Sequence, residues 1–437
     1  MVIRLPDDVE FILQRLKSYG SVGYIVGGCV RDYMLGKEPD DWDICTPLLP
    51  EIVKKLFSDY QVIETGIKHG TVTVVINDNQ YEITTFRIDG KYSDGRHPDN
   101  VYFTDSLKQD LSRRDFTMNA LAYSPDTGII DYFNGVEDIE NGIVRCVGDA
   151  KERFAEDPLR VLRALRFVCV LNFDIDIYSL YAANSYSKHL RNVSRERICS
   201  ELAKMLKTKY PARLKQYMPH IWGVILNALL STNAEIPVKA SSQAISSLLY
   251  SRDDLILRLA LVFQDYGIDV NGLMKILRFD NVTTKAVCEL VARKDEYRYT
   301  LLNCQDEFGY ILRKYVSTIG YDQTERLLEY WRAIVEASYN IGRFSYLSAI
   351  DNMKNILDEI KKRNDCCTVK DLDVTGDDLI GIGYEEGESI GIVLKLLLDE
   401  VLKMPFANKK NWLVNWAEKH LTELKGKENA VQTDEGN

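Results

Sequence analysis

Gly27-Gly-Cys-Val-Arg-Asp32 and Asp41-Trp-Asp43 are the two stretches that decide the fold of this chain. The first follows an apolar run, Val22–Val26, and opens a segment with helical character. Paired glycines let the backbone approach a ligand closely, and a helix N-terminus offers free N–H groups to phosphate. Arg31 adds a charge-assisted contact to such an anion. The stretch also fits a plain strand-to-helix turn in which Arg31 and Asp32 form a surface ion pair.

Asp41 and Asp43 are candidate metal ligands. If Trp42–Cys45 is a strand, both carboxylates point to one face, about 6–7 Å apart, and Trp42 turns into the core. Carboxylates so placed can bridge two divalent ions about 3.5–4 Å apart, and Glu82 on a neighbouring strand could supply a third. Such oxygen ligands suit Mg²⁺, which also holds substrate phosphates. Taken alone, Asp-x-Asp is more typical of a solvated turn, and it is the upstream stretch Gly27–Asp32 that favours the metal site.

The chain divides into an N-terminal part with mixed signals and a long helical part. A helix is predicted over Pro50–Phe57 and strands over Val22–Val26, Trp42–Cys45, Thr71–Ile76 and Tyr81–Phe86. Helical periodicity runs from about residue 151 to about residue 425. We therefore expect an α+β protein with a mixed-sheet head followed by an elongated, all-helical neck, body and tail. The expected domains are a head at 1–145, a neck at 146–215, a body at 216–340, a tail at 341–425 and a polar end at 426–437.

The composition is that of a soluble globular protein. Of 437 residues, 46% are hydrophobic and 27% charged. No stretch approaches the roughly 18 apolar residues that span a bilayer, and the N-terminus has no basic region followed by an apolar run. The nine cysteines include no Cys-x-x-Cys pair, which argues against a disulfide framework and a zinc site. We expect a cytoplasmic protein with no membrane partner.

The net charge of −10 conceals a basic segment. Residues 151–215 contain 14 Lys/Arg and 7 Asp/Glu, a balance of +7, so the remainder carries −17. A basic segment in an acidic protein is typical of a surface that binds a nucleic-acid backbone. A set of well-solvated helical faces would have the same composition.

Several blocks in a fixed order resemble a known family. Gly27–Asp32 followed by Asp41–Asp43 resembles the first motif of the class II tRNA nucleotidyltransferases and bacterial poly(A) polymerases, members of the polymerase-β-like superfamily. The further blocks that match are Gly66–Val72, Glu82–Arg87, Asp110–Ala120, Glu156–Phe167 and Ser194–Ile198 with Glu201. The resemblance spans about residues 20–205.

The resemblance implies roles for particular residues. Asp41 and Asp43 would hold the catalytic Mg²⁺ ions, with Glu82 as the third carboxylate. Gly28 and Arg31 would bind the triphosphate of ATP or CTP. Further nucleotide contacts would come from Arg114, Asp157, Arg160, Arg163 and Arg166. The expected partners are tRNA, at its 3′ end and its elbow, ATP and CTP. DNA is not an expected partner, and the protein would be a monomer or a homodimer.

The segment around Asp157 looks like the family's protein template for the incoming base. Cytosine and adenine both present an amino donor beside a ring-nitrogen acceptor, whereas uracil and guanine present a carbonyl acceptor beside an N–H donor. A carboxylate acceptor next to a guanidinium donor therefore fits C and A only. Asp157 and Arg160, three apart on a helix, would form that pair, with Arg163 and Arg166 contacting phosphate or sugar. Asp157 before Pro158 is also a helix-capping signature, and one oxygen could cap while the other meets the base.

The expected activity is addition of C, C and A to the 3′ end of tRNA. Relatives that add only CC lack a flexible segment at the position of Ile88–Pro98, so its presence weighs against CC-only addition. Asp94 and Arg96 in this segment could engage other parts of the site, and His97 replaces an arginine of many relatives. An A-adding enzyme that works with a separate CC-adding enzyme remains an alternative. A poly(A) polymerase, which usually carries a basic extension, is a further one.

The C-terminal half contains a degenerate hydrolase signature. Leu255–Asp265 resembles the helix on which some relatives carry a His-Asp metal pair, but here the pair is Gln264-Asp265. None of the five histidines has a metal-ligand spacing. We therefore expect this region to be a helical scaffold. The stretch Asp378–Lys395 resembles the family's tail element.

Overall fold

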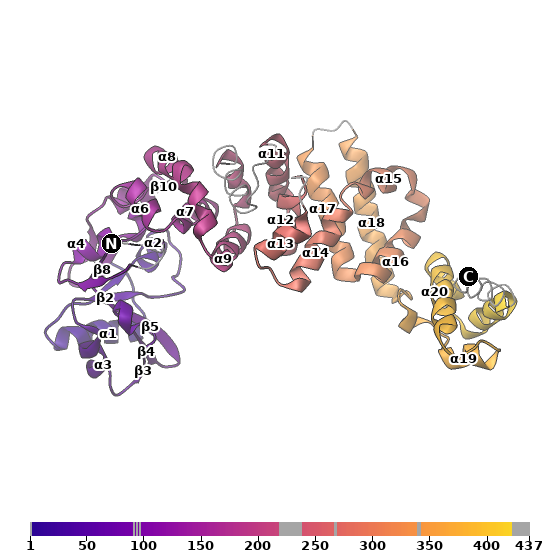
Figure 1. Ribbon diagram of the computed structural model, residues 1–437, viewed down its shortest axis with the longest axis horizontal. Helices are drawn as coiled ribbons and strands as arrows, with labels where there is room; N and C mark the ends of the chain where they lie inside the picture. The colour runs from indigo at the N-terminus through magenta and orange to yellow at the C-terminus, as the bar shows by residue number, and fades with distance from the viewer. Residues whose placement is uncertain are drawn as a thin grey trace, which may run out of the picture. The chain divides into compact units, whose positions relative to one another are not determined.

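The computed structural model describes residues 2–90, 92, 95, 98–217, 238–265, 269–338 and 342–421. The chain forms two compact units (Figure 1). The first contains residues 1–242 and 272–280, and the second contains residues 243–271 and 281–437. Within the described ranges, no helix combines the length and the apolar character needed to cross a membrane.

A seven-stranded mixed sheet is the centre of the first unit. Its strands lie in the order β3 (Gln61–Ile63), β4 (Thr71–Ile76), β5 (Asn79–Thr85), β2 (Ile44–Thr46), β1 (Tyr24–Val26), β8 (Leu121–Ser124) and β9 (Gly128–Asp131). Only β2 and β5 are parallel in this sheet. Two small sheets accompany it, formed by β6 (Arg87–Asp89) with β7 (Val101–Phe103) and by β10 (Ile143–Val144) with β11 (Asp174–Ile175).

The period-2 pattern of the sequence explains the two faces of this sheet. Residues of β4 and β5 alternate between buried and more exposed, so one face packs on the core and the other stays open. The strand predicted over Thr71–Ile76 is β4, with the same bounds. The strand predicted over Trp42–Cys45 begins later, at Ile44, because pairing with β1 starts there. Trp42 is accordingly half-buried and not part of the core.

Short helices surround the sheet. The α-helices described wholly within this unit are α1 (Asp7–Ser18), α2 (Gly28–Met34), α3 (Pro50–Leu56), α4 (Leu107–Ser112), α5 (Gly135–Glu140), α6 (Ala150–Glu156), α7 (Leu159–Leu171), α8 (Ile177–Tyr186) and α9 (Arg195–Leu206). The described 3₁₀ helices of this unit are η1 (Ile67–His69), η2 (Thr117–Asn119), η3 (Ser187–Asn192) and η4 (Pro211–Tyr217). Helix α2 contacts β1 and β8, and α3 contacts β4 and β5. The helix predicted after Gly28 is α2.

The last helices of the first unit pack on one another. Helix α7 buries its apolar side against α9 and η4, while its arginines occupy other positions of the helix. Helices α6 and α7 are separated at Asp157, whose backbone is extended (φ −142°, ψ 100°). Pro158 follows and forbids the helix from running straight through, because proline disfavours helical geometry at the residue before it.

All the secondary-structure elements described in the second unit are α- or 3₁₀-helices. Its elements are η6 (Ser247–Tyr250), α12 (Leu255–Phe263), α14 (Asn281–Ala292), α15 (Glu296–Asn303), η7 (Gln305–Glu307), α16 (Phe308–Ile319), α17 (Tyr321–Ala337), α18 (Arg343–Arg363), η8 (Val369–Asp371), α19 (Gly376–Gly381), α20 (Glu388–Lys403) and η9 (Pro405–Ala407). Helices α11 (Val238–Ser246) and α13 (Val270–Ile276) contain residues of both units.

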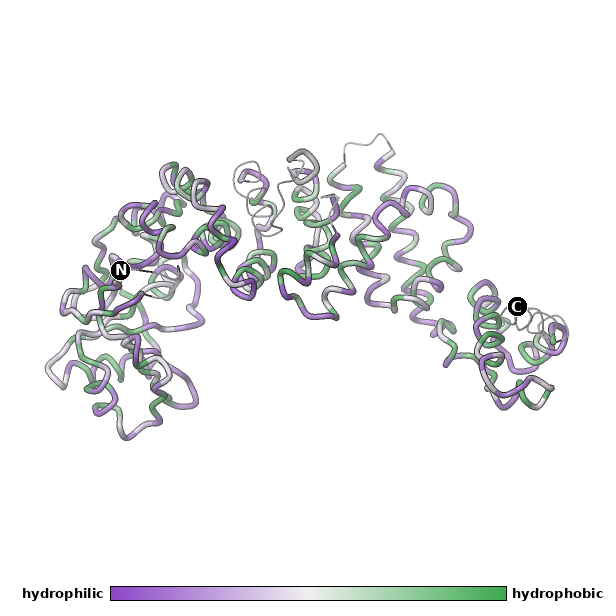
Figure 2. The backbone as a smooth tube through the Cα atoms, in the orientation of Figure 1, coloured by the Kyte–Doolittle hydropathy of each residue, from purple (hydrophilic) through white to green (hydrophobic). Residues whose placement is uncertain are grey.

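Apolar side chains hold the second unit together. Helix α17 packs against α12, α16 and α18, and a separate core lies around α20, with Leu397 and Val401 at its centre. Figure 2 shows hydrophobic and hydrophilic residues interleaved along these helices, as expected where one side of a helix is buried. The predicted architecture, a mixed-sheet head followed by a mostly helical remainder, is confirmed.

Candidate active site

The turn between β1 and α2 brings three distant parts of the sequence together. Gly27 has φ +84° and ψ −130°, a conformation that favours glycine. A Cβ atom at this position would lie 2.8 Å from Nη1 of Arg114 and 3.9 Å from Oδ2 of Asp43. Because Gly27 has no side chain, Arg114 and Asp43 can both lie close to the backbone of the turn.

Two of the three predicted metal-binding carboxylates, Asp41 and Asp43, lie just before β2, and the third, Glu82, lies on the neighbouring strand β5. Asp43 directly precedes β2, and its carbonyl accepts a hydrogen bond from the Val26 amide at 3.0 Å. Because Ile44 pairs with Ile83 in the parallel β2–β5 ladder, Asp43 lies beside Glu82. All three carboxylate residues, Asp41, Asp43 and Glu82, are exposed to solvent.

Their charges act on one another. Burial by surrounding protein atoms raises the pKa of Glu82, and the charges of Asp43 and Asp41 raise it further. Burial also raises the pKa of Asp43, where Arg114 opposes the effect and Asp41 adds to it. In the described part of the chain no three His, Cys, Asp or Glu side chains already stand as a finished metal-ligand cluster. Mutually repelling carboxylate oxygens are nevertheless a donor set that fits a hard divalent cation.

Arg31 lies in helix α2 just after the glycine turn, and three of its N–H groups already donate to protein acceptors. Its Nε and Nη2 donate to Asp32 at 2.9 and 2.8 Å, and its Nη1 donates to Oδ1 of Asn119 at 2.5 Å. The ion pair with Asp32 expected for a plain turn is thus present, although Arg31 is buried and not on the surface. A guanidinium carries five N–H donors, so these three bonds leave two for a ligand.

Arg114 has unused hydrogen-bonding capacity beside the carboxylates. Its Nη2 is 3.8 Å from Oδ2 of the fully buried Asp110, and its buried Nε has no hydrogen-bond partner. Buried donors are normally satisfied, and an unsatisfied one in a site points to a missing ligand. Arg114 is therefore well suited to receive a phosphate group next to Gly27.

A cavity of about 360 Å³ contains both residues of the predicted base-selecting pair. It is lined by His69, Arg87, Asp89, Tyr92, Pro98, Arg113, Asp157 and Arg160. The structure corrects one detail, since Asp157 and Arg160 do not lie on one helix. Asp157 occupies the break between α6 and α7, and Arg160 lies in the first turn of α7. The backbone bend still leaves both side chains at the same cavity.

Both groups of this pair are held in place by protein contacts. Oδ1 of Asp157 accepts from the Leu159 amide at 3.1 Å, as the capping signature predicted, and Oδ2 accepts from Nη2 of Arg197 at 2.7 Å. The Arg160 guanidinium donates to Oε2 of Glu156 at 2.5 Å and to two backbone carbonyls. Each carboxylate oxygen has a second lone pair, so these contacts orient the acceptor without consuming it.

Arg163 and Arg166 do not line this cavity. Arg163 donates twice to Oδ2 of Asp115, at 2.9 and 2.5 Å, and Arg166 donates from Nε to Oε2 of Glu201 at 2.7 Å. Their predicted contacts with phosphate or sugar therefore compete with internal ion pairs.

The segment after β6 is described only in part. Tyr92 donates from its hydroxyl to Oδ2 of Asp89 at 2.7 Å, and Gly95 lies close to Pro158, since a Cβ on Gly95 would be 3.7 Å from its Cδ. Asp94, Arg96 and His97, which the sequence singled out, lie outside the described residues.

Models of three protein families match separate parts of the chain. Residues 23–145 match the poly A polymerase head domain, residues 172–219 a probable RNA and SrmB-binding site of polymerase A, and residues 249–417 a putative tRNA nucleotidyltransferase domain 2. These descriptions agree with the resemblance of the sequence motifs.

The relatives with full-length matches decide the family. A CCA-adding enzyme of Levilactobacillus brevis is 32% identical over 422 residues, which cover 94% of this chain and 98% of that enzyme. The chain belongs to the CCA-adding enzyme family. A CCA-adding enzyme of Leuconostoc mesenteroides is 47% identical over 208 residues, and this match spans only 51% of that relative and 47% of the chain. The crystal structure of a Bacillus stearothermophilus CCA-adding enzyme in complex with CTP is 27% identical, with a TM-score of 0.73, and the match covers 97% of this chain and all of that one.

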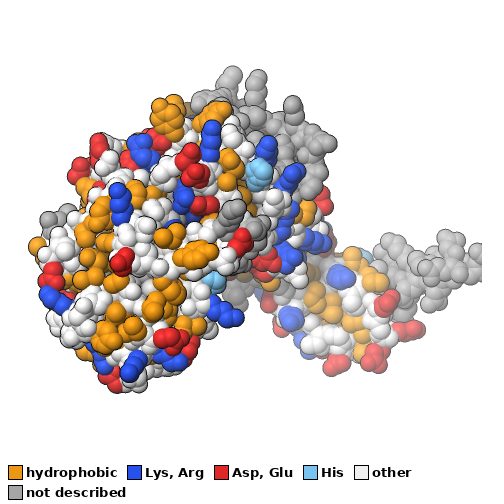
Figure 3. Space-filling model, turned by 60° about the vertical axis from the view of Figure 1, so that its left-hand side comes forward, with side chains coloured by type: hydrophobic (Ala, Val, Ile, Leu, Met, Phe, Trp, Pro, Cys, Tyr) orange, Lys and Arg blue, Asp and Glu red, His pale blue; other side chains and the backbone are white. Residues whose placement is uncertain are grey.

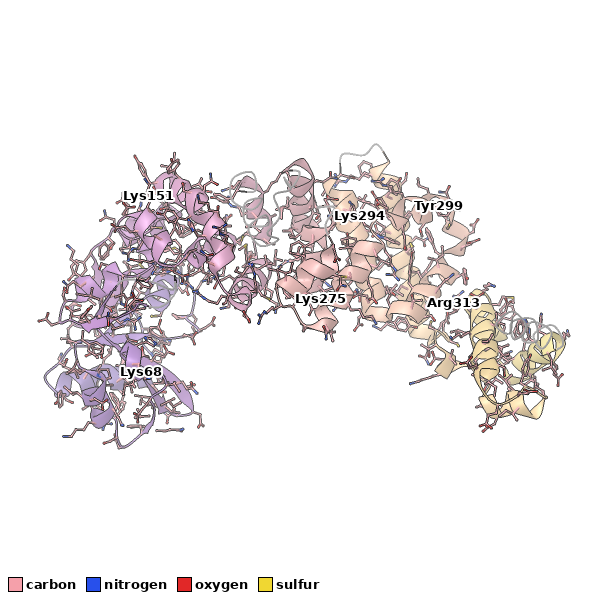
Figure 4. The ribbon with its side chains drawn as sticks, viewed as in Figure 1. Lys68, Lys151, Lys275, Lys294, Tyr299 and Arg313 are labelled. Carbon is pink, nitrogen blue, oxygen red and sulfur yellow. The ribbon has the colours of Figure 1, made fainter. Side chains whose placement is uncertain are left out.

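As a member of the CCA-adding enzyme family, the protein is a tRNA nucleotidyltransferase. In the degenerate hydrolase signature, both Gln264 and Asp265 are engaged by side chains from distant parts of the sequence. Lys294 forms an ion pair with Asp265, and Tyr330 donates to Oε1 of Gln264 at 3.3 Å. Figure 4 labels Lys294 among the helices of the second unit. A lysine ammonium thus neutralises the carboxylate that remains of the His-Asp pair, which supports the expectation of a scaffold.

Sequence reasoning missed the partners that hold the predicted residues. Arg197, Asn119 and Asp115 each lie inside a matching block, yet none was assigned a role. Their contacts join residues 40 or more positions apart, so no local periodicity signals them. The block Ser194–Ile198, quoted only as a resemblance, was the one hint at Arg197.

Proposed function

We propose that this tRNA nucleotidyltransferase adds C, C and A to the 3′ end of tRNA from CTP and ATP, with Mg²⁺ as its cofactor. The observation that carries the proposal is the position of Asp43, which lies beside Glu82 in the strand register and, with Arg114, beside the Gly27 turn. Carboxylates for a metal and a guanidinium for a phosphate are the two elements that nucleotidyl transfer requires.

Asp41, Asp43 and Glu82 are the residues that would hold Mg²⁺. The bound metal would make the RNA 3′-hydroxyl a better nucleophile and offset charge on the phosphates. Arg31 and Arg114 hold the triphosphate through N–H groups left free by their protein contacts. Gly28 keeps the approach open, since a Cβ there would lie 3.5 Å from Nη2 of Arg31.

Base selection takes place in the cavity of about 360 Å³ beside Asp157 and Arg160. The carboxylate accepts from the amino group of cytosine or adenine, and the guanidinium donates to the adjacent ring nitrogen. Uracil and guanine would place acceptor against acceptor and donor against donor, leaving buried groups unpaired. Arg163 and Arg166 form ion pairs with Asp115 and Glu201, and contacts of these arginines with phosphate or sugar would have to form beside those pairs.

Exposed cations near the end of the first unit support tRNA binding. Within residues 188–215, six exposed lysine and arginine side chains form no ion pair with the described residues, and these are Lys188, Arg191, Lys204, Lys207, Lys209 and Lys215. Figure 3 shows acidic and basic side chains interspersed on one face of the protein. An excess of unpaired cations favours contact with an RNA backbone. We propose that the tail contacts the tRNA elbow. We further propose that the protein is a monomer or homodimer and acts in the cytoplasm.

The decisive experiment supplies one nucleotide at a time to three tRNAs that end before the first C, after the second C, or after the terminal A. We expect C to be added twice to the first tRNA, one A to the second, and nothing to the third. Addition of A to the second tRNA, without any C on the first, would instead identify an A-adding enzyme. Long A tails on unrelated RNA would identify a poly(A) polymerase.

A further inference from the structure

Three arginines of the site converge on one buried aromatic ring. The guanidinium carbons of Arg166, Arg31 and Arg163 lie 4.4, 5.1 and 5.9 Å from the ring centroid of Phe167. Phe167 is only 4% exposed. Cations within about 6 Å of an aromatic face are attracted by its quadrupole, and the attraction grows as water is excluded.

Each of the three arginines keeps its own carboxylate. Arg31 pairs with Asp32, Arg163 with Asp115, and Arg166 with Glu201. Three like charges around one ring would otherwise repel each other strongly in a water-poor environment. The three positive charges around the Phe167 ring are thus balanced by three carboxylates.

The ring also packs against a second aromatic side chain, one that does not contact the arginines. Phe116 meets Phe167 edge-to-face, with centroids 5.6 Å apart and planes at 82°. Phe116 is fully buried and, in the described part of the chain, no guanidinium lies over its ring. Phe116 and Phe167 therefore share size, burial and packing, but only Phe167 touches the arginines.

Arg31 is the member of this cluster that reaches the glycine turn. Two of its five N–H groups have no partner among the contacts described above, and Gly28 leaves Nη2 uncovered. Its flat guanidinium needs a support that fixes its plane without using those donors. An aromatic ring provides such a support, because a cation–π contact engages the face of the guanidinium and not its N–H edge.

We propose that Phe167 is a positioning residue for the nucleotide triphosphate, because its ring holds the Arg31 guanidinium at the Gly27–Gly28 turn. Phe167 lies on α7, the helix that also carries Arg160. One residue therefore connects the helix that selects the base with the turn that binds the phosphates. The inference rests on the proposed role of Arg31.

Steady-state kinetics of Phe167→Leu, Phe167→Tyr and Phe116→Leu test the proposal. Leucine keeps most of the volume and removes the aromatic face. We expect Phe167→Leu to raise the KM for both ATP and CTP about tenfold, with kcat changed less than about twofold. Phe167→Tyr should restore KM to within about twofold, since it keeps the face. Phe116→Leu, the matched control, should lower Tm but leave KM unchanged.

A double-mutant cycle with Arg31→Met shows whether Phe167 acts through Arg31. We expect Arg31→Met by itself to raise KM. In the Arg31→Met background, Phe167→Leu should raise KM further by less than about twofold. An equal rise in both backgrounds, or no rise in either, would overturn the proposal. If Arg31→Met leaves KM unchanged, the triphosphate role of Arg31 and this inference fail together. C, C and A addition, scored in the same assay, would then still stand.

Discussion

Arg197 donates a hydrogen bond from Nη2 to Oδ2 of Asp157 at 2.7 Å, joining residues 40 positions apart. The other oxygen of Asp157 accepts from the Leu159 amide. The carboxylate is therefore held at both oxygens, and both side chains are largely shielded from water, with 13% and 22% of Asp157 and Arg197 exposed. The plane of the proposed base acceptor is set by a residue on a different helix.

Loss of Arg197 should loosen base selection. We expect Arg197→Met to lower the ratio of kcat/KM for CTP to that for UTP by about tenfold, the effect of losing one charge-assisted hydrogen bond. Competition assays with the two nucleotides would measure this ratio. Arg191→Met removes an exposed arginine without an ion pair among the described residues and should leave the ratio unchanged. An unaltered ratio in a folded Arg197→Met protein would count against the role of Arg197.

Neutralising Glu82 should stabilise the metal-free protein. A carboxyl with a raised pKa in the folded state favours folding when protonated, so stability is lost as the pH rises through that pKa. In EDTA near pH 7 we expect Glu82→Gln to raise Tm by roughly 1–2 °C, a small gain because the group is exposed. The difference should vanish below roughly pH 4, where both folded and unfolded carboxyls are protonated. Calorimetry that finds a lower Tm for Glu82→Gln near pH 7 would show that the repulsion is absent.

Asp115 should make a large contribution to stability. Burial alone would raise its pKa, but Arg163 and the Asn119 amide outweigh burial and hold the pKa well below its usual range. Its contribution is therefore present above the unfolded pKa and lost as the pH falls through the folded one. We expect Asp115→Asn to cost about 3 kcal/mol, the low end for a broken buried pair because Arg163 is one-third exposed.

Urea denaturation would measure this cost. The exposed Asp105 offers a matched control, and Asp105→Asn should change the free energy of unfolding by less than about 0.5 kcal/mol. Equal effects of the two substitutions would refute the importance of the Asp115–Arg163 pair.

The local features of the fold could be predicted from the sequence, and its long-range contacts could not. The bounds of β4 follow from its β-branched residues, and the turn at Gly27 follows from its paired glycines. The sequence pattern predicts Trp42 in the core of a strand over Trp42–Cys45, but ladder pairing begins at Ile44. The spacing of Asp157 and Arg160 predicts one helical face, but Pro158 disfavours helical geometry at Asp157, which lies between α6 and α7.

The partners of the site arginines lay beyond sequence reasoning. Arg31 and Asn119 are 88 positions apart, and Arg163 and Asp115 are 48 apart. Their pairing depends on how the sheet and α7 pack together, which no local pattern encodes. For the same reason the role inferred for Phe167 emerged only from the structure.

Transfer of a nucleotide at Asp43 is the central claim, and the direct measurement compares Asp43→Asn with Asp40→Asn. Asp40 is an exposed carboxylate of the same loop, three positions away. With Mg²⁺, CTP and a tRNA that lacks its 3′ C, C and A, we expect Asp43→Asn to lower kcat at least roughly thousandfold while the Kd for tRNA is retained. Asp40→Asn should keep wild-type activity. Asp43→Asn protein that retained a tenth or more of the wild-type rate would contradict the account.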